Sequence, residues 1–211
     1  MSNKKYILMK KIILIIALFI SIINIANAQF TIGPKLGLNI SKEYVGIEGI
    51  DETVDFKNGI NAGIFGKYMM SDKFDIQAEL LYSQQGYKCN IPLVDYGGIA
   101  ITDGYKLSSH YLNIPLLLKY YPLERIYIEA GPQAGFCFST KVSPIENKDD
   151  ITLNRDYNTV VFLLVGGVGV DIGYGLSLNA RYNHGLTHTL PNTTWKNRVI
   201  QISLLYDLWS F

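Results

Sequence analysis

The side chains that could do chemistry in this chain are charged residues set at odd-numbered positions inside apolar stretches. Four are basic and five are acidic: Lys35, Lys67, Asp75, Glu79, Lys119, Glu129, Asp171, Arg181 and Asp207. A buried charge is tolerated only when it is paired or hydrogen-bonded. We therefore expect a network of salt bridges that fills the interior of the fold. The alternative use of the same residues is a path for ions or protons.

Three histidines are the other candidates for chemistry. His184 and His188 lie at the end of one apolar stretch, and His110 follows Ser108 and Ser109. A lipid-modifying enzyme would combine a histidine with a serine and an acid, but no nucleophile motif surrounds either serine. A metal site needs more ligands than His184 and His188 supply. We predict no catalytic residue, no metal site and no cofactor.

The two cysteines, Cys89 and Cys137, leave one question open. Export from the cytoplasm would permit a disulfide between them. One strand is expected to separate them, so a bridge depends on the loop that carries Cys89. The sequence allows both the bridged and the free state.

The elements that must position these residues show a polarity period of two. In residues 30–40 the even positions are apolar, and the odd positions are polar or glycine. This alternation is typical of a strand with one apolar and one polar face. No helical period separates the stretches, which predicts an all-β, eight-stranded antiparallel up-and-down transmembrane barrel. The expected strands are 30–40, 58–69, 73–86, 109–121, 125–139, 159–172, 175–184 and 197–209.

The gaps between these strands alternate in length. Residues 70–72, 122–124 and 173–175 have the composition of tight turns. The gaps 41–57, 87–108, 140–158 and 185–196 are long and polar, and 41–57 is acidic. Short turns at one end and long loops at the other are typical of outer-membrane barrels, with the short turns in the periplasm. An even strand count then places both chain ends in the periplasm.

The direction of the two faces distinguishes a membrane barrel from a soluble one. In a soluble periplasmic barrel the apolar face would point inward. The other face is rich in glycine, which is unfavourable in an exposed strand but suits a narrow lumen. Aromatic residues also cluster toward both ends of the strands, where they would meet lipid headgroups. We predict that even-numbered side chains face lipid and odd-numbered ones fill the lumen.

The first 28 residues have the features of an export signal. Four lysines precede an apolar run of about a dozen residues, and Ala26-Asn27-Ala28 resembles a cleavage site. We expect a signal peptide over 1–28 and one barrel domain over 29–211. The whole chain has a net charge of +1, without the basic patch that nucleic-acid binding requires.

Several segments resemble the PorT-like outer-membrane β-barrel family, also called the porin family. They are Phe30–Asn39, Gln77–Gly86, Leu112–Tyr120, Ile128–Gln133 and Ala180–Thr187. The resemblance covers nearly all of 29–211 and implies an integral protein of the Gram-negative outer membrane. It transfers no catalytic residue. Members commonly end on a Tyr-x-Phe-like sequence, whereas here Trp209-Ser210-Phe211 follow Tyr206-Asp207-Leu208 and place Phe211 on the lumenal parity, unless the strand bulges near Trp209.

These observations predict a structural or interaction component of the cell envelope rather than an enzyme. The family's founding member is associated with protein secretion, so a secretion accessory is one form of this role. The expected partners are outer-membrane lipid, the barrel-assembly machinery, and other envelope or secretion proteins contacted through the long loops. The alternatives are a small pore for solutes and a lipid-modifying barrel enzyme.

Overall fold

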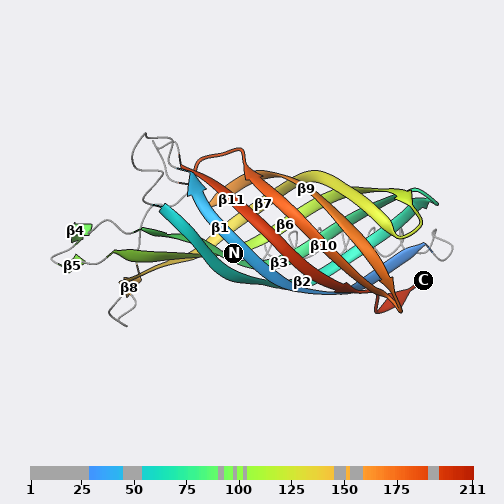
Figure 1. Cartoon of the computed structure of the whole chain (residues 1–211), viewed down its shortest axis with the longest axis horizontal. Helices are drawn as coiled ribbons and strands as arrows, with labels where there is room; N and C mark the ends of the chain where they lie inside the picture. The colour runs from blue at the N-terminus through green and yellow to red at the C-terminus, as the bar shows by residue number, and fades with distance from the viewer. Residues whose placement is uncertain are drawn as a thin grey trace, which may run out of the picture.

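Eight long strands follow one another around a closed antiparallel sheet (Figure 1). The computed structural model describes residues 29–44, 54–89, 93–96, 99–101, 104–144, 151–152, 159–189 and 195–211. The expected signal peptide, 1–28, lies outside these residues. The long strands are β1 (Phe30–Tyr44), β2 (Val54–Ser71), β3 (Phe74–Cys89), β6 (Tyr105–Leu123), β7 (Ile126–Pro144), β9 (Val160–Gly173), β10 (Leu176–Gly185) and β11 (Lys196–Tyr206).

The barrel closes where the first long strand pairs with the last. β1 pairs with β11 over ten positions, from Lys35 opposite Leu205 to Tyr44 opposite Lys196. Within the described residues, closure leaves the eight long strands without an unpaired edge in the barrel wall, which a membrane requires because lipid cannot satisfy backbone groups. The short strands are β4 (Leu93–Tyr96), β5 (Ile99–Ile101), β8 (Ile151–Thr152) and β12 (Trp209–Ser210). The predicted eight-stranded antiparallel barrel is confirmed.

The two ends of the barrel differ as the gap lengths predict. Tight turns join β2 to β3, β6 to β7 and β9 to β10 at one end, which we call the short-turn end. Both termini of the described chain meet there, since Phe30 and Phe211 exchange two backbone hydrogen bonds. At the turn after β9, Gly173, Tyr174 and Gly175 all have positive φ. We call the opposite end the long-loop end.

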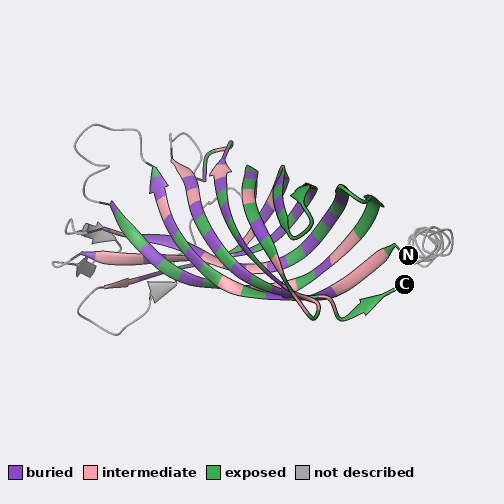
Figure 2. Ribbon diagram, turned by 45° about the vertical axis from the view of Figure 1, so that its right-hand side comes forward, coloured by how far each residue is buried: buried purple, intermediate pink, exposed green. Residues whose placement is uncertain are grey.

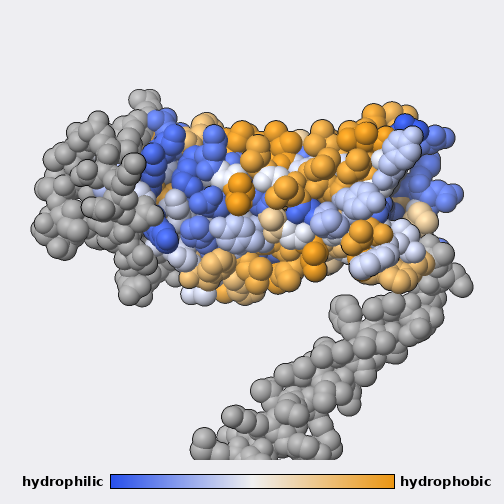
Figure 3. Space-filling model, turned by 90° about the horizontal axis from the view of Figure 1, so that it is seen from below, coloured by the Kyte–Doolittle hydropathy of each residue, from blue (hydrophilic) through white to orange (hydrophobic). Residues whose placement is uncertain are grey.

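The side chains alternate between exposed and buried along the middle of each long strand, as the bands in Figure 2 show. Ile64, Leu116 and Leu204 are 60%, 52% and 45% exposed, whereas their neighbours Phe65, Leu117 and Leu205 are 3% exposed or less. The outward residues form an apolar band around the middle of the barrel, with polar residues toward both ends (Figure 3). The predicted outward direction of the apolar face is confirmed. In the described residues, no helix is long and apolar enough to span a membrane.

The lumen is less polar than the sequence analysis assumed. It also buries large apolar and aromatic side chains, namely Phe65, Leu81, Tyr111, Leu117, Tyr127, Val161, Leu163, Val165, Val199 and Leu205. All of them occupy odd positions, so the alternation alone could have placed them inside. A narrow barrel must be filled to native density, and apolar side chains fill the space between hydrogen-bonded polar groups.

The strands at the long-loop end are longer than predicted. β1 continues to Tyr44, β3 to Cys89 and β7 to Pro144, and β6 begins at Tyr105. Pairing continues there although the strict alternation has stopped, because backbone hydrogen bonds do not depend on side-chain polarity. Glu43, expected in a solvated acidic loop, is buried in β1 and is 1% exposed.

Two β-bulges cause the break in alternation. The register shifts between β2 and β3 after Phe56, and between β6 and β7 after His110. Each shift adds one residue to one strand and reverses which positions face inward beyond it. Val54 and Val142, both at even positions, are therefore buried in the lumen. Two lumenal side chains of β1 repair the ladder at the first bulge, since Asn39 donates to the carbonyl of Gln84 and Ser41 accepts from the amide of Gly86.

A third irregularity, in the pairing of β1 with β11 and β12, determines which way the side chain of Phe211 points. β1 pairs Lys35 with Leu205 but Ile32 with Trp209, so one extra residue lies between these two pairs. Trp209 and Phe211 consequently face outward, with 59% and 57% exposure. The bulge near Trp209 that the sequence analysis named thus explains the parity of Phe211.

Candidate functional site: a charge cluster in a filled lumen

Arg181 lies at the centre of the lumen and binds two carboxylates. Its Nη2 lies 2.7 Å from Oε1 of Glu79, and its Nη1 lies 2.8 Å from Oε2 of the same residue. Its Nε and Nη2 also donate to Glu129. Nζ of Lys35 lies 3.1 Å from Glu79 Oε2. These four side chains, which we call the central cluster, come from β10, β3, β7 and β1.

The surrounding strands leave room for this cluster. Gly167 on β9 lies opposite both Glu129 and Arg181 in the sheet register. A Cβ at this position would come within 2.8 Å of Arg181 Cγ. The central cluster is also held by amides, because Asn179 donates to Glu129 and Gln77 donates to Glu79.

Lys119 and Asp75 extend the charges toward the short-turn end. Lys119 lies opposite Asp75 on β3 and Glu129 on β7. Its Nζ sits 4.0 Å from the centroid of the Tyr127 ring, which favours a cation. Asp75 hydrogen-bonds the side chain of Tyr121. Among the nine predicted charges, three basic and three acidic side chains are thus buried, so the buried charge is balanced.

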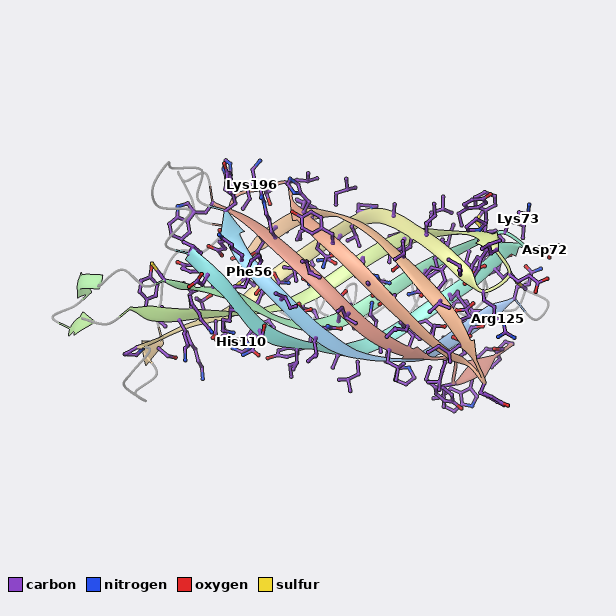
Figure 4. All side chains as sticks on the ribbon, viewed as in Figure 1. Phe56, Asp72, Lys73, His110, Arg125 and Lys196 are labelled. Carbon is purple, nitrogen blue, oxygen red and sulfur yellow. The ribbon has the colours of Figure 1, made fainter. Side chains whose placement is uncertain are left out.

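The three remaining predicted charges lie apart from the central cluster. Lys67 pairs with Asp207 at 3.1 Å, and their side chains are 16% and 25% exposed. Asp171 accepts a hydrogen bond of 2.7 Å from Ser177 beside the turn after β9. Figure 4 shows Asp72, Lys73 and Arg125 at this same end. The nine charges therefore form a central cluster of four, a neighbouring layer of two, the separate Lys67–Asp207 pair, and Asp171 bound to Ser177.

Above the central cluster, toward the long-loop end, the lumen holds a layer of amides and hydroxyls. Asn39 donates to Ser83 and accepts from Asn61, and Ser203 donates to Asn61. Gln201 also donates to Asn39 at 3.4 Å. This layer connects β11, β1, β2 and β3, which are consecutive around the closed sheet.

The long-loop end of the lumen holds a group of buried apolar side chains. Val54, Tyr87, Cys89, Leu107 and Val142 form a buried group, which we call the apolar cap. Tyr105 and Trp195 pack against it, and the Trp195 and Tyr87 rings are 5.7 Å apart. Sequence reasoning missed this group because it treated 87–108 and 140–158 as loops.

The structure separates the residues of the catalytic alternative. Ser109 faces the lumen and bonds Thr140, whereas His110 takes the opposite parity and its Nδ1 lies 2.7 Å from the hydroxyl of Tyr82. His184 is on β10, and β7 and β9 lie between it and β6. Within the described chain, no group of three or more His, Cys, Asp or Glu residues is arranged to hold a metal.

The two cysteines are free thiols that lie on either side of β6. Cys89 is buried in the apolar cap, and Sγ of Cys137 lies 3.6 Å from the Thr140 hydroxyl. Of the two states that the sequence allows, the structure has the free one.

The comparisons with known proteins agree with this geometry. Residues 24–190 match the family model described as "Outer membrane protein beta-barrel domain". Neisserial surface protein A has 9% identity and a TM-score of 0.54, with 84% of this chain and 97% of that chain covered. At this identity the likeness supports the barrel fold alone.

Two further solved barrels have lower TM-scores. For the attachment invasion locus protein of Yersinia pestis, Ail, the identity is 11%, the TM-score is 0.48, and 84% of this chain and 98% of that chain are covered. For the outer membrane protein OprG of Pseudomonas aeruginosa, the identity is 14% and the TM-score is 0.47, with 85% of this chain and 95% of that chain covered. No curated protein sequence matches this chain.

Proposed function

Because this chain belongs to the outer membrane protein beta-barrel domain family, we propose that it is a closed envelope scaffold that conducts no solute and catalyses no reaction. Its working surface is the long-loop end, because barrels commonly hold function on loops that a rigid body positions. A role as an accessory to protein secretion or envelope assembly fits this form. The expected partners are the bilayer, the barrel-assembly machinery and other envelope proteins.

The observation that supports this proposal is the filled lumen. The central cluster, the amide layer and the apolar cap follow one another along the barrel, and their members are buried. An aqueous pore would need a continuous wet path, whereas the apolar cap offers few groups to hydrate an ion. The central cluster is best understood as a plug that joins strands β1, β3, β7 and β10.

Single-channel recording in planar bilayers tests the closed state. Barrels whose folding has been verified by heat-modifiable gel mobility should give no steady open level. A reproducible open level in the wild-type protein would overturn the proposal and favour a small solute pore.

Comparison of lipid A by mass spectrometry in cells with and without the protein tests the enzymatic alternative, and we expect identical spectra.

The orientation in the envelope is also part of the proposal, with both termini and the tight turns in the periplasm. Peptide tags distinguish the two directions. A tag inserted in the connection 145–150 should be detected by antibody on intact cells, whereas a tag between Asp72 and Lys73 should be detected only after the outer membrane is opened. The reverse pattern would contradict the assignment.

A further inference from the structure

A groove of about 380 Å³ lies on the outer wall of the barrel at the long-loop end. Its lining comes from β1, β2, β10 and β11, which are consecutive around the closed sheet. The residues that line it are Ile40, Lys42, Tyr44, Phe56, Tyr182, Arg198 and Ile200. Figure 4 places Phe56 at this end of the barrel. We call this feature the rim groove.

The rim groove spans the border of the apolar band. Ile40 and Ile200 are 36% and 41% exposed and face the lipid. The next outward positions on the same two strands are Lys42 and Arg198, so the wall changes from apolar to basic within one step. Acyl chains meet headgroups at such a border, where aromatic and basic side chains anchor a protein.

The charge in the rim groove has one sign. Among the described residues that line it, two are basic and none is acidic. The Arg198 guanidinium lies 4.3 Å from the centroid of the Tyr44 ring, and Lys42 Nζ lies 5.8 Å from that of Phe56. The rings hold the two cations against the barrel wall. The Lys42 and Arg198 side chains therefore lose less conformational freedom when a ligand binds.

Arg198 has a donor that the described chain leaves unsatisfied. Its Nε is buried and has no hydrogen-bond partner within the part of the protein that the structure describes. Buried donors in native proteins are normally paired. A guanidinium is well suited to a phosphate, which accepts several of its hydrogen bonds at once.

We propose that the rim groove binds the phosphorylated headgroup of an anionic membrane lipid. The phosphate lies between Lys42 and Arg198, and the acyl chains run along Ile40 and Ile200. The commitment to a lipid, rather than to free phosphate, comes from the apolar floor that joins the groove to the lipid-facing band. The inference depends on the barrel spanning a bilayer but not on a closed lumen, so the conductance result does not decide it.

Native mass spectrometry of the folded barrel in detergent tests the inference. The probes are phosphatidylglycerol, phosphatidylcholine with the same acyl chains, and inorganic phosphate. The wild-type protein should retain one phosphatidylglycerol in preference to phosphatidylcholine. The double variant K42Q/R198Q should bind phosphatidylglycerol about twenty-five-fold more weakly, since each of the two basic residues contributes about fivefold to the attraction of an anionic lipid.

The matched control is K106Q/K141Q, which removes two basic side chains from β6 and β7 at the same end of the barrel. It should change phosphatidylglycerol binding by less than about twofold, because β6 and β7 lie on the far side of the closed sheet from β1 and β11 and charges are screened over about 10 Å. Equal losses in the two double variants, or no lipid preference in the wild type, would overturn the site. Displacement of the lipid by equimolar inorganic phosphate would overturn the choice of a lipid.

If K42Q/R198Q fails to fold, K42Q alone should bind phosphatidylglycerol about fivefold more weakly. An unchanged affinity in K42Q would overturn the site.

Discussion

At the scale of residues, the central cluster pairs charges that have left water. Removing a carboxylate or guanidinium from water costs several kcal/mol, and close pairing offsets this cost only when the hydrogen bonds are complete. Arg181 meets this condition with bonds to both Glu79 and Glu129, and Lys35 adds a second cation to Glu79. The cluster thus favours the strand register in which these charges are paired.

Loss of Arg181 should therefore destabilise the folded barrel. In Arg181→Ala, Glu79 and Glu129 lose their shared partner, and we expect a cost of about 3–5 kcal/mol. Urea unfolding in lipid vesicles, followed by heat-modifiable gel mobility, measures it. The control is Lys67→Ala, which breaks the partly exposed pair with Asp207 and should cost less than about 1 kcal/mol. A wild-type unfolding midpoint in Arg181→Ala would show that the cluster is not a structural plug.

At the scale of elements, the alternation in the sequence predicts much of each strand but not its irregularities. Polar and apolar residues alternate cleanly in the middle of the strands, and the outward direction of Leu116 follows from that pattern. Bulges arise from the register between two strands, which a single segment does not contain. This is why the inward positions of Val54 and Val142, two of the five residues of the apolar cap, could not be read from the chain.

The charged residues show the same division. Their odd positions predict that Lys35, Glu79, Glu129 and Arg181 face the lumen. Their grouping depends on the stagger of strands around the barrel, which brings β3 and β10 to one level although they are distant in sequence. The alternation therefore predicts that a charged side chain lies inside the barrel. Its pairing partner can be identified only from the strand register of the closed barrel.

A charge on the lipid face should be costly in the middle of a strand. In Leu116→Arg we expect a loss of about 2–4 kcal/mol in folding free energy, because the guanidinium would lie near the bilayer midplane. Leu123→Arg, at the short-turn end of β6, is the matched control and should cost about 0–1 kcal/mol. Refolding into vesicles over a urea series gives both values. Equal values for the two variants would contradict the placement of the band.

The repair of the bulge between β2 and β3 gives a second prediction at this scale. Ser41→Ala removes the acceptor of the Gly86 amide, and we expect a cost of about 1–3 kcal/mol. Hydrogen exchange at Gly86 should become faster. Ser177→Ala, whose hydroxyl bonds Asp171 instead, should leave that amide unchanged. Unaltered exchange at Gly86 in Ser41→Ala would show that another group satisfies it.

At the scale of the whole molecule, one alternating pattern divides the chain between two environments. Even-numbered side chains face outward through most of each long strand, and odd-numbered ones are buried in the lumen. Closure of β1 on β11 removes the edges of the barrel sheet, and the bulges reverse the pattern only near the two ends of the barrel. The filled barrel and its apolar outer surface both result from this alternation.

Paramagnetic relaxation from a lipid with a doxyl group deep in its acyl chain tests the division most directly. The wild-type barrel in nanodiscs needs no substitution for this measurement. Methyl signals of Ile64, Leu116 and Leu204 should be strongly broadened, whereas those of Leu81, Leu117 and Leu205 should keep most of their intensity. Equal broadening of the two sets, or broadening of the second set alone, would contradict the account.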